Sequence, residues 1–512
     1  MVLLFNPRSA NAKYRIPNSI LQVAAAIEGK YEYILVDGNL ETDPWEKIRQ
    51  YLLTGKVRYF GCTCMPGPQL RQAIPITQKI RAEFPHIINI WGGYFASNQY
   101  KTVITSGVVD FIIDGPGDYA FPNLLELLEK EYQGNSQSIT TFCQENAALF
   151  MMENLIYLKS GEIIKTKKAP IPDYNVLPQL PYEKLHQFYP LEKYLGKTYL
   201  GKKTIAYHSS FGCPFTCSFC AVVPIYNARW KGKSAELIYQ DIRYLKEKYG
   251  ADGIEFHDNN FFVSEKRTVA FAELVKNDNM TWWGEARIDT MDKYSDASLA
   301  KIREAGCKMI FFGAETGNDE VLKKMDKGGT QTGAQILSFA ERLKKFDIIP
   351  EYSFVLGLPA ETEEQVMVQI NADIAFIKQV KLANPATEII IYLYSPVPTE
   401  GSELYEAVKD SGFLFPQTLA DWLDPKWENF DLRKNPLTPW LKPYMVDKIK
   451  HFETVLNGYY PTVSDIRLSA FQRKMIRAMS TLRYKNDIFS YPYELKVLQK
   501  LWKYRQPEIE GF

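Results

Sequence analysis

The chain has 512 residues, of which 46% are hydrophobic and 24% charged, and its formal net charge is +1. A chain of this length exceeds what one hydrophobic core supports and predicts a globular protein of about two to four domains. The near-zero net charge argues against nucleic acid or an anionic membrane surface as the main partner, and no apolar run reaches the ~18 residues of a membrane span.

The first 135 residues alternate strand and helix signals. Short apolar runs predict strands at residues 2–5, 33–36, 57–62, 87–90 and 111–113, with amphipathic helices such as 19–28 between them. Glycines cluster where the later strands end, at Gly92, Gly93, Gly115 and Gly117. Because the carboxyl ends of parallel strands form the ligand-binding edge of an open sheet, we predict a doubly wound, Rossmann-like domain with a cofactor crevice over residues 1–135.

A linker and a second series of alternating elements follow. Residues 136–200 show no sustained periodicity and contain several prolines, which predicts a linker. Strands are then predicted at residues 204–208, 253–257, 281–286, 308–313, 349–356 and 388–394, with helices such as 235–249 and 363–380 between them. This α/β pattern predicts a partial (β/α)6 barrel of the TIM type over residues 201–400, whose chemistry belongs at the carboxyl ends of the strands. Residues 401–512 are aromatic-rich and predict a C-terminal helical domain.

Three cysteines lie directly after the first predicted barrel strand. Cys213, Cys217 and Cys220 have the spacing C-x3-C-x2-C. Three thiolates on a short loop can hold three irons of a 4Fe-4S cubane and leave the fourth iron open to a small molecule. The alternatives are chance and a zinc site, but structural zinc sites want four ligands, usually as two separated pairs, and no second pair exists.

The cysteine content of the whole chain indicates the cellular compartment. Seven cysteines in a chain of this length do not make a disulfide framework, so we expect a reducing cytoplasm. The first residues form an apolar run without a basic leader, so no secretory signal is expected.

The cysteine motif and the loops after it resemble the radical S-adenosylmethionine (SAM) superfamily, and specifically its cobalamin-binding branch, over roughly residues 1–400. Matching motifs end the second, third and fourth barrel strands in the family's order, at Asp258, Arg287 and Glu315. The resemblance implies that the three cysteines are catalytic and bind the cluster. It further implies that Glu315 accepts hydrogen bonds from the ribose of SAM. Arg287 and Asp258 would hold polar parts of the same ligand, beside the aromatic Phe219.

The N-terminal series resembles the cobalamin domain of the same branch. The resemblance implies a cobalamin site formed by Met65, Gln69, Gly92, Gly93, Gly115 and Gly117. The chain departs from other cobalamin proteins because it has no D-x-H-x-x-G motif, so no histidine is placed to bind the lower face of the cobalt. Members of this branch commonly lack that motif.

The resemblance implies an enzyme that cleaves SAM reductively at the cluster. The 5′-deoxyadenosyl radical so formed would abstract hydrogen from an unactivated carbon, and C-methylation through methylcobalamin is the first hypothesis. A ring-forming or oxidative enzyme similar to the anaerobic magnesium-protoporphyrin ester cyclases is the second, and a non-catalytic cobalamin sensor is the third. The expected partners are a small-molecule or peptide substrate and an electron donor such as flavodoxin or ferredoxin, with no nucleic acid.

Overall fold

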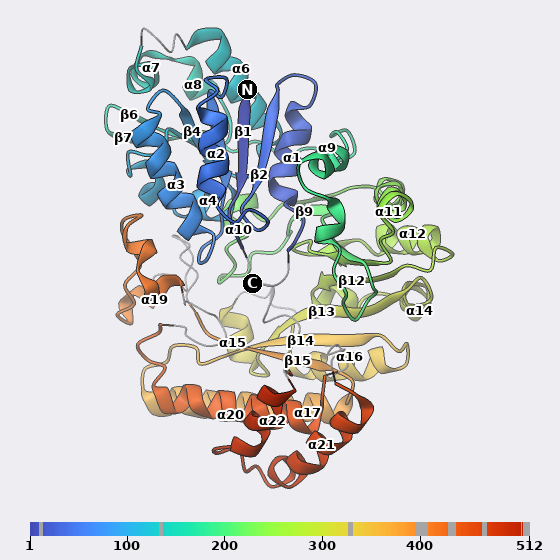
Figure 1. The fold of residues 1–512 in the computed structure, drawn as a ribbon. Helices are drawn as coiled ribbons and strands as arrows, with labels where there is room; N and C mark the ends of the chain where they lie inside the picture. Colours follow the sequence, from blue (N-terminus) through green and yellow to red (C-terminus); the bar gives the residue numbers. More distant parts are fainter. Residues whose placement is uncertain are drawn as a thin grey trace.

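Two sheets of mainly parallel strands, each covered by helices, make up most of the computed structural model (Figure 1). The structure describes residues 1–9, 14–132, 137–325, 331–395, 408–428, 437–462, 468–502 and 504. The predicted domain boundaries at 135/136 and 400/401 lie outside these residues. In the view of Figure 1 the N-terminal sheet stands above the second sheet, and the C-terminal helices form the base.

The N-terminal sheet has a parallel core with the strand order β2-β1-β3-β4-β5. Its strands are β1 (Val2–Asn6), β2 (Tyr33–Asp37), β3 (Tyr59–Thr63), β4 (Ile88–Gly92) and β5 (Phe111–Ile113). Alternate residues of a strand face opposite sides of the sheet, so Leu4 joins one hydrophobic cluster and Leu3 the other. Burial on both faces explains why β1 is apolar throughout.

Helices cover both faces of this sheet. α1 (Asn18–Ile27) and α6 (Gly117–Glu131) pack on the face of Leu4, whereas α2 (Pro44–Leu52) and α3 (Leu70–Glu83) pack on the face of Leu3. The predicted doubly wound, Rossmann-like arrangement is therefore confirmed.

The linker predicted for residues 136–200 is in part a piece of the first sheet. After α7 (Ile139–Glu145) and α8 (Ala148–Met151), the strands β6 (Leu155–Lys159) and β7 (Glu162–Lys165) form an antiparallel hairpin. β6 pairs with β5 through Ile112 and Ile113, which brings the sheet to seven strands. β7 is a short, largely exposed edge strand, so its residues show too little alternation to be recognised as a strand.

The second sheet has six parallel strands in the order β15-β14-β13-β12-β11-β8. They are β8 (Thr204–Tyr207), β11 (Gly253–Phe256), β12 (Thr281–Ala286), β13 (Cys307–Glu315), β14 (Ile349–Leu356) and β15 (Glu388–Leu393). Helices α11 (Ala235–Tyr249), α12 (Glu265–Val275), α14 (Asp296–Glu304), α16 (Gly333–Lys344) and α17 (Glu363–Ala383) connect them. The open sheet with all strands parallel confirms the predicted partial barrel.

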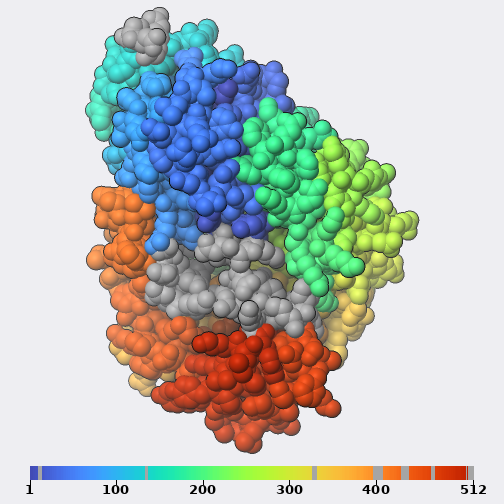
Figure 2. Space-filling view, in the orientation of Figure 1, coloured from blue at the N-terminus to red at the C-terminus, as the bar shows by residue number. Residues whose placement is uncertain are grey.

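The described part of the C-terminal region is helical. It contacts the domain of the second sheet and also the N-terminal domain. α20 (Pro443–Tyr459) packs on α17, and α21 (Ala470–Lys485) and α22 (Tyr493–Leu501) pack on α20, at the base of Figures 1 and 2. The 3-10 turn η3 (Asp421–Leu423) and α19 (Pro425–Glu428) lie instead beside the N-terminal domain, where the rings of Trp422 and Phe95 meet edge to face at 5.1 Å. No helix among the described residues combines the length and apolarity needed to cross a bilayer.

Candidate functional site

The cysteine loop is presented by a small hairpin at the carboxyl end of β8. Strand β9 (Ser210–Gly212) pairs antiparallel with β10 (Trp230–Gly232), and the loop and α10 (Val223–Tyr226) lie between them. Gly212, directly before Cys213, has φ +77°, and a Cβ there would lie 2.1 Å from the carbonyl oxygen of Arg229. Only glycine therefore allows the hairpin to close at the point where the loop begins.

The three cysteines differ in exposure from the other four. None of the seven cysteines, all within the described residues, forms a disulfide; Cys213, Cys217 and Cys220 are partly exposed, whereas Cys62, Cys64, Cys143 and Cys307 are buried. Among the described residues no three metal-binding side chains converge on one point. A cubane does not require that convergence, because each cysteine binds a different iron. The donor set thus fits a 4Fe-4S cluster better than a single ion.

The carboxylate of Asp258 holds the backbone that leads into this hairpin. Its carboxylate is 1% exposed and accepts hydrogen bonds from the backbone N–H and hydroxyl of Ser209, at 2.7 and 2.9 Å, and from both groups of Ser210. Burial raises the pKa of Asp258, while the nearby Arg267 and the serine donors lower it. These bonds turn the carboxylate toward the backbone that leads into the cysteine loop, and its contact with SAM stays a prediction.

Arg287 lies between the barrel and the cysteine loop. It follows β12 and begins the short helix α13 (Ile288–Met291). Its Nη1 donates to the sulfur of Cys217 at 3.0 Å, and its Nε and Nη2 pair with the carboxylate of Asp289 at 3.0 and 2.8 Å. The guanidinium also stacks over the ring of Phe215, 3.9 Å from the centroid. The arrangement holds a cation next to Cys217, one of the three predicted cluster ligands.

Glu315 ends β13 in a conformation that is unusual for a non-glycine residue. Its φ is +64°, and the pairing of β13 with β14 shifts register between Gly313 and Glu315. Gln331 clamps this bulge by donating from Nε2 to the carbonyls of Gly313 and Ala314, at 3.1 and 3.2 Å. Bulges and left-handed residues commonly re-aim a side chain at a functional site. The strain is consistent with a ligand role for Glu315.

The glycines at the edge of the N-terminal sheet come together around one cavity. A space of about 170 Å³ is lined by Gly92, Gly93, Gly115 and Gly117, together with Ser19 and Val23 of α1. Met65 and Gln69 do not line it. Gln69 instead braces the neighbouring loop, since its Oε1 accepts from the N–H of Met65 at 2.6 Å and its Nε2 donates to the carbonyl of Pro7 at 3.1 Å.

The glycine edge and the cysteine hairpin face one another. Phe211 of β9 and Tyr226 of α10 line the same cavity as the glycines. The Nδ2 of Asn98, in the helix α4 (Gly93–Asn98), donates to the carbonyl of Ala221 at 3.3 Å. Tyr94 belongs to the same helix, which packs against α10; burial, with a smaller contribution from Cys220, raises the pKa of its hydroxyl. The two ligand edges thus share one interface.

Phe219 belongs to the same interface. It is partly buried and packs against the hydrophobic cluster that contains Phe95 and Cys64 of the N-terminal domain. The same cluster includes Met325 and Leu358 of the second domain, so Phe219 packs where the two domains meet.

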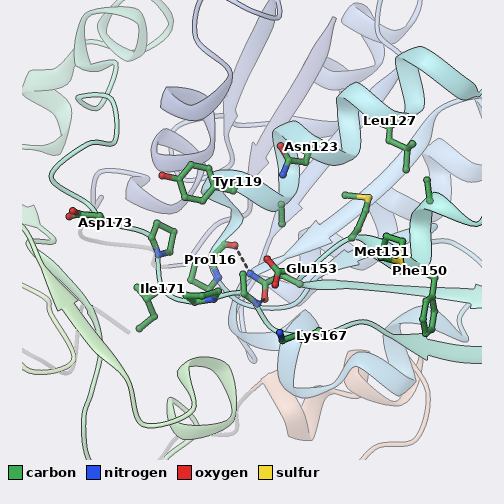
Figure 3. Close-up of a pocket in the computed structure, with 17 residues that line it drawn as sticks. Pro116, Tyr119, Asn123, Leu127, Phe150, Met151, Glu153, Lys167, Ile171 and Asp173 are labelled. Atoms are coloured by element: carbon green, nitrogen blue, oxygen red, sulfur yellow. Dashed lines mark hydrogen bonds between the residues drawn. The ribbon is translucent and has the colours of Figure 1, made fainter.

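A second, larger groove of about 870 Å³ opens on the other side of the turn that contains Pro116 (Figure 3). Tyr119 and Asn123 of α6 border it, as do Met151 at the end of α8 and Lys167 beyond β7. None of the predicted site residues lines this groove.

Three residues at the interface were not assigned a role from the sequence. Asp289 and Asn260 each lie two residues after a residue with a predicted role, Arg287 and Asp258 respectively, so their neighbourhood in the sequence offered a signal. Tyr94 carried none, because its closeness to Cys220 depends on the packing of one domain against the other.

Comparisons with known proteins agree with this geometry. Residues 207–368 match the model of the radical SAM superfamily. An uncharacterised methyltransferase of Pyrococcus horikoshii is 23% identical over 393 residues, covering 74% of this chain and 78% of the relative. The anaerobic magnesium-protoporphyrin IX monomethyl ester cyclase of Synechocystis is 26% identical over 297 residues, and the match spans 55% of this chain and about half (55%) of that relative.

Two kinds of solved structure share the fold. The cobalamin-dependent SAM radical enzyme OxsB, with aqua-cobalamin and SAM bound, aligns with a TM-score of 0.68 at 16% identity, over 98% of this chain and 75% of that one. The radical SAM methyltransferase TsrM from Kitasatospora setae, with cobalamin and a 4Fe-4S cluster bound, aligns with a TM-score of 0.61 at 13% identity, over 94% and 99% of the two chains.

Proposed function

Residues 207–368 form a radical SAM superfamily domain, and on that premise we propose that the chain is a cobalamin-dependent radical SAM enzyme that methylates an unactivated carbon of its substrate. The observation that carries the proposal is the shared wall between the two predicted cofactor sites. Phe211 and Tyr226, on either side of the cysteine loop, line the cavity of Gly92, Gly93, Gly115 and Gly117. A substrate at this interface has both sites within reach.

The cysteine loop would hold the cluster, with Cys213, Cys217 and Cys220 as its three ligands. When bound, the cluster and cobalamin supply the electron that cleaves SAM and the methyl group that is transferred. The chain's own share is to bind, orient and shield the reactants. Arg287 keeps a positive charge beside Cys217, and Asp258 fixes the backbone of Ser209 and Ser210 that leads into the loop.

SAM would lie between the loop and the end of β13. The carboxylate of Glu315 is 6% exposed and is aimed by the bulge that Gln331 clamps, so it can accept hydrogen bonds from the ribose. The guanidinium of Arg287 offers the matching contact for the carboxylate of the methionine part. Both roles remain proposals for these residues.

The glycine edge would take cobalamin. The cavity is narrow and mostly apolar, and it lies between α1 and the ends of β3, β4 and β5, which suits the flat base on the long arm of cobalamin. A Cβ at Gly93 would lie 2.5 Å from Oγ1 of Thr63, and one at Gly117 would lie 3.2 Å from Val23. The chain's own packing therefore requires glycine at these two positions, which line the cavity without a side chain. Met65 is half exposed nearby and could contact the corrin from the loop after β3.

Methylation is favoured over the two other hypotheses by the relatives. Several are named as methyltransferases, including a hopanoid C-3 methylase, although an ester cyclase is also among them. A non-catalytic sensor would not need three partly exposed thiols on one loop. The substrate would be a small molecule or a peptide, electrons would come from a donor such as flavodoxin or ferredoxin, and the cysteines favour a reducing compartment such as the cytoplasm.

The test is an anaerobic assay of the full chain. The protein is reconstituted with ferrous iron, sulfide and cobalamin, reduced with dithionite, and supplied with methyl-labelled SAM and a small-molecule extract of the host cells. We expect 5′-deoxyadenosine and a labelled product, both absent with Cys217→Ala. 5′-Deoxyadenosine with label only in methionine would replace methylation by ring formation or oxidation. No 5′-deoxyadenosine from protein that holds the cluster would leave the sensor hypothesis.

A further inference from the structure

The side-chain amide of Asn260 is fully buried without a hydrogen-bond partner. Asn260 lies four residues beyond the end of β11 and is 0% exposed. Within the described part of the chain, neither its Nδ2 nor its Oδ1 has a partner. More than nine-tenths of buried polar groups in folded proteins are paired, so a buried amide with both ends open indicates a ligand that the chain itself does not supply.

The usual local use of an asparagine is ruled out at this position. Asn260 precedes the 3-10 turn η2 (Phe261–Val263) as its N-cap residue, yet its side chain makes no capping hydrogen bond. Asparagine is among the best N-caps because its Oδ1 normally satisfies the first free N–H groups of a helix. The amide is therefore turned away from the turn that it begins.

The backbone around Asn260 is clamped, so the amide is held in place. The indole N–H of Trp230 donates to the carbonyl of Asn260 at 3.2 Å. Arg267 donates from Nη1 to the carbonyl of Phe261 at 3.0 Å, and its guanidinium lies over the rings of both Phe261 and Trp230. These contacts hold the backbone at Asn260 and at the residue after it, while the side chain itself is buried.

The amide is directed toward the cysteine loop. Trp230, whose indole holds the carbonyl of Asn260, pairs in the β9–β10 hairpin with Gly212, the residue directly before Cys213. In keeping with this placement, the side chain of Asn260 is among the groups that lower the pKa of the Cys213 thiol, which burial raises. Two residues earlier, Asp258 holds the serines that precede Gly212 and Cys213. One loop thus supports the start of the cysteine loop with a carboxylate and faces its first sulfur with an amide.

We propose that Nδ2 of Asn260 donates a hydrogen bond to a sulfur on the Cys213 side of the bound 4Fe-4S cluster and thereby raises the cluster's reduction potential. The inference rests on the proposed function, because it requires the cluster. Reduction places additional negative charge on the cluster and its sulfurs, so a fixed N–H donor stabilises the reduced form more than the oxidised form. Because the amide is buried and held, water does not replace the donor when the side chain is removed.

The experiment compares midpoint potentials of reconstituted variants. Asn260→Leu and Asn260→Asp keep nearly the same volume and delete both N–H donors. Asn384→Leu is the matched control: Asn384 is also buried, at 1% exposed, but its amide is satisfied by the carbonyl of Ala340 and the N–H of Ala386, at 2.9 and 3.0 Å. Iron content and the potential from a redox titration followed by electron paramagnetic resonance are measured for each, without SAM.

Both Asn260 variants are expected to keep their iron and to become harder to reduce, by about tenfold in the equilibrium constant, or ~59 mV for a one-electron couple. Asn384→Leu is expected to leave the potential unchanged. An unchanged potential in either Asn260 variant that retains its iron overturns the inference.

A measurement on the unmutated protein covers the case in which neither variant binds iron. Labelling with asparagine that carries ¹⁵N only at the side-chain amide should give a nitrogen hyperfine coupling in the reduced cluster, and its absence overturns the inference. If the unmutated protein never assembles a 4Fe-4S cluster, the proposed function itself fails. That result differs from an assembled cluster that is insensitive to Asn260.

Discussion

Arg287 and Cys217 meet at 3.0 Å, from the guanidinium Nη1 to the thiol sulfur, although 70 residues separate them in the chain. The same guanidinium forms a buried pair with Asp289 and covers the ring of Phe215. The contact joins the end of the third barrel strand to the cysteine loop. It therefore links the stability of the barrel edge to the position of the thiols.

Removing Arg287 should destabilise the chain strongly. Arg287→Leu leaves the buried carboxylate of Asp289 without its main counter-charge, and we expect a loss of about 3–5 kcal/mol in the free energy of unfolding, measured by chemical denaturation. The double variant Arg287→Leu/Asp289→Leu should recover most of this loss. Arg303→Leu is the control, because its partner Asp347 is 84% exposed and such a pair contributes about 1 kcal/mol or less. Equal losses for Arg287 and Arg303 would contradict the buried pair.

Cys217→Ala should abolish binding of the cluster. Replacing a buried cysteine outside the loop should leave cluster binding unchanged. We expect the iron content after anaerobic reconstitution to fall from about four atoms per chain to near zero, because two thiolates cannot hold the cubane. Cys143→Ala should keep its iron, since Cys143 packs as a small apolar side chain in the N-terminal domain. Full iron binding by Cys217→Ala would remove this residue from the ligand set.

Glu315→Gln should weaken SAM binding without unfolding the loop. The change keeps the shape of the side chain but replaces a charged acceptor by a neutral one. A hydrogen bond to a charged group contributes about 1.5–3 kcal/mol, so we expect the dissociation constant of SAM to rise about tenfold to hundredfold in equilibrium dialysis of the reconstituted protein. Glu320→Gln, on the exposed start of the next helix, should bind SAM as the unmutated protein does. Unchanged affinity in Glu315→Gln would argue against the ribose contact.

Two glycines separate the effect of backbone strain from the effect of a filled cavity. Gly93 and Gly107 have similar φ values, +84° and +73°, but a Cβ at Gly93 would lie 2.5 Å from Oγ1 of Thr63 whereas one at Gly107 would meet nothing within 4 Å. Both alanine variants should lose about 1 kcal/mol of stability from backbone strain, and Gly93→Ala should lose more because its Cβ displaces Thr63, which lines the cavity. Only Gly93→Ala should also lower cobalamin affinity, by about tenfold or more, measured by retention of the corrin absorbance on gel filtration. Equal retention by both variants would place cobalamin elsewhere.

Asp373 should make stability depend on pH in a predictable direction. This α17 residue is buried beside Thr316, whose hydroxyl donates to it at 2.5 Å, and burial raises its pKa to about 6. The other side chains that line the adjoining cavity carry no charge. Because the folded chain holds a proton that the unfolded chain releases near pH 4, this contribution is fully present below about pH 4 and is lost as the pH rises through about 6.

The Asp373 contribution amounts to about 3 kcal/mol, from ~2 pKa units at ~1.4 kcal/mol each. Asp373→Asn should therefore gain stability relative to the unmutated protein between about pH 4 and pH 7, measured by denaturation at each pH. A constant difference between the two proteins across this range would show that Asp373 is ionised at the same pH in the folded and unfolded states.

Much of the fold could be predicted from local patterns. The six barrel strands and the five parallel strands of the first sheet lie within a few residues of their predicted positions, because strands buried on both faces appear as short apolar runs. The hairpin β6–β7 was missed because one of its strands is short and exposed, and its membership of the sheet depends on pairing with β5.

The site was only partly predictable. The spacing of Cys213, Cys217 and Cys220 was enough to predict a cluster site. The glycines near the ends of β4 and β5 were enough to predict where a crevice lies. The hydrogen bonds of Asp258 to Ser209 and Ser210, which lie 49 and 48 residues away in the chain, could not be predicted from local patterns, and its contact with SAM stays a prediction. Asn260 received no role, because the absence of a partner becomes visible only when all its neighbours are in place.

By itself, the sequence determined which residue types follow which strands: three thiols after the first barrel strand, a carboxylate after the fourth, and glycines at the edge of the first sheet. The tertiary structure decided that the cysteine hairpin and the glycine edge share one cavity, that Arg287 touches Cys217, and that Glu315 is held at φ +64°. The physical reason is that element positions follow from the local period of apolar residues, whereas contacts between distant residues follow from how whole domains pack.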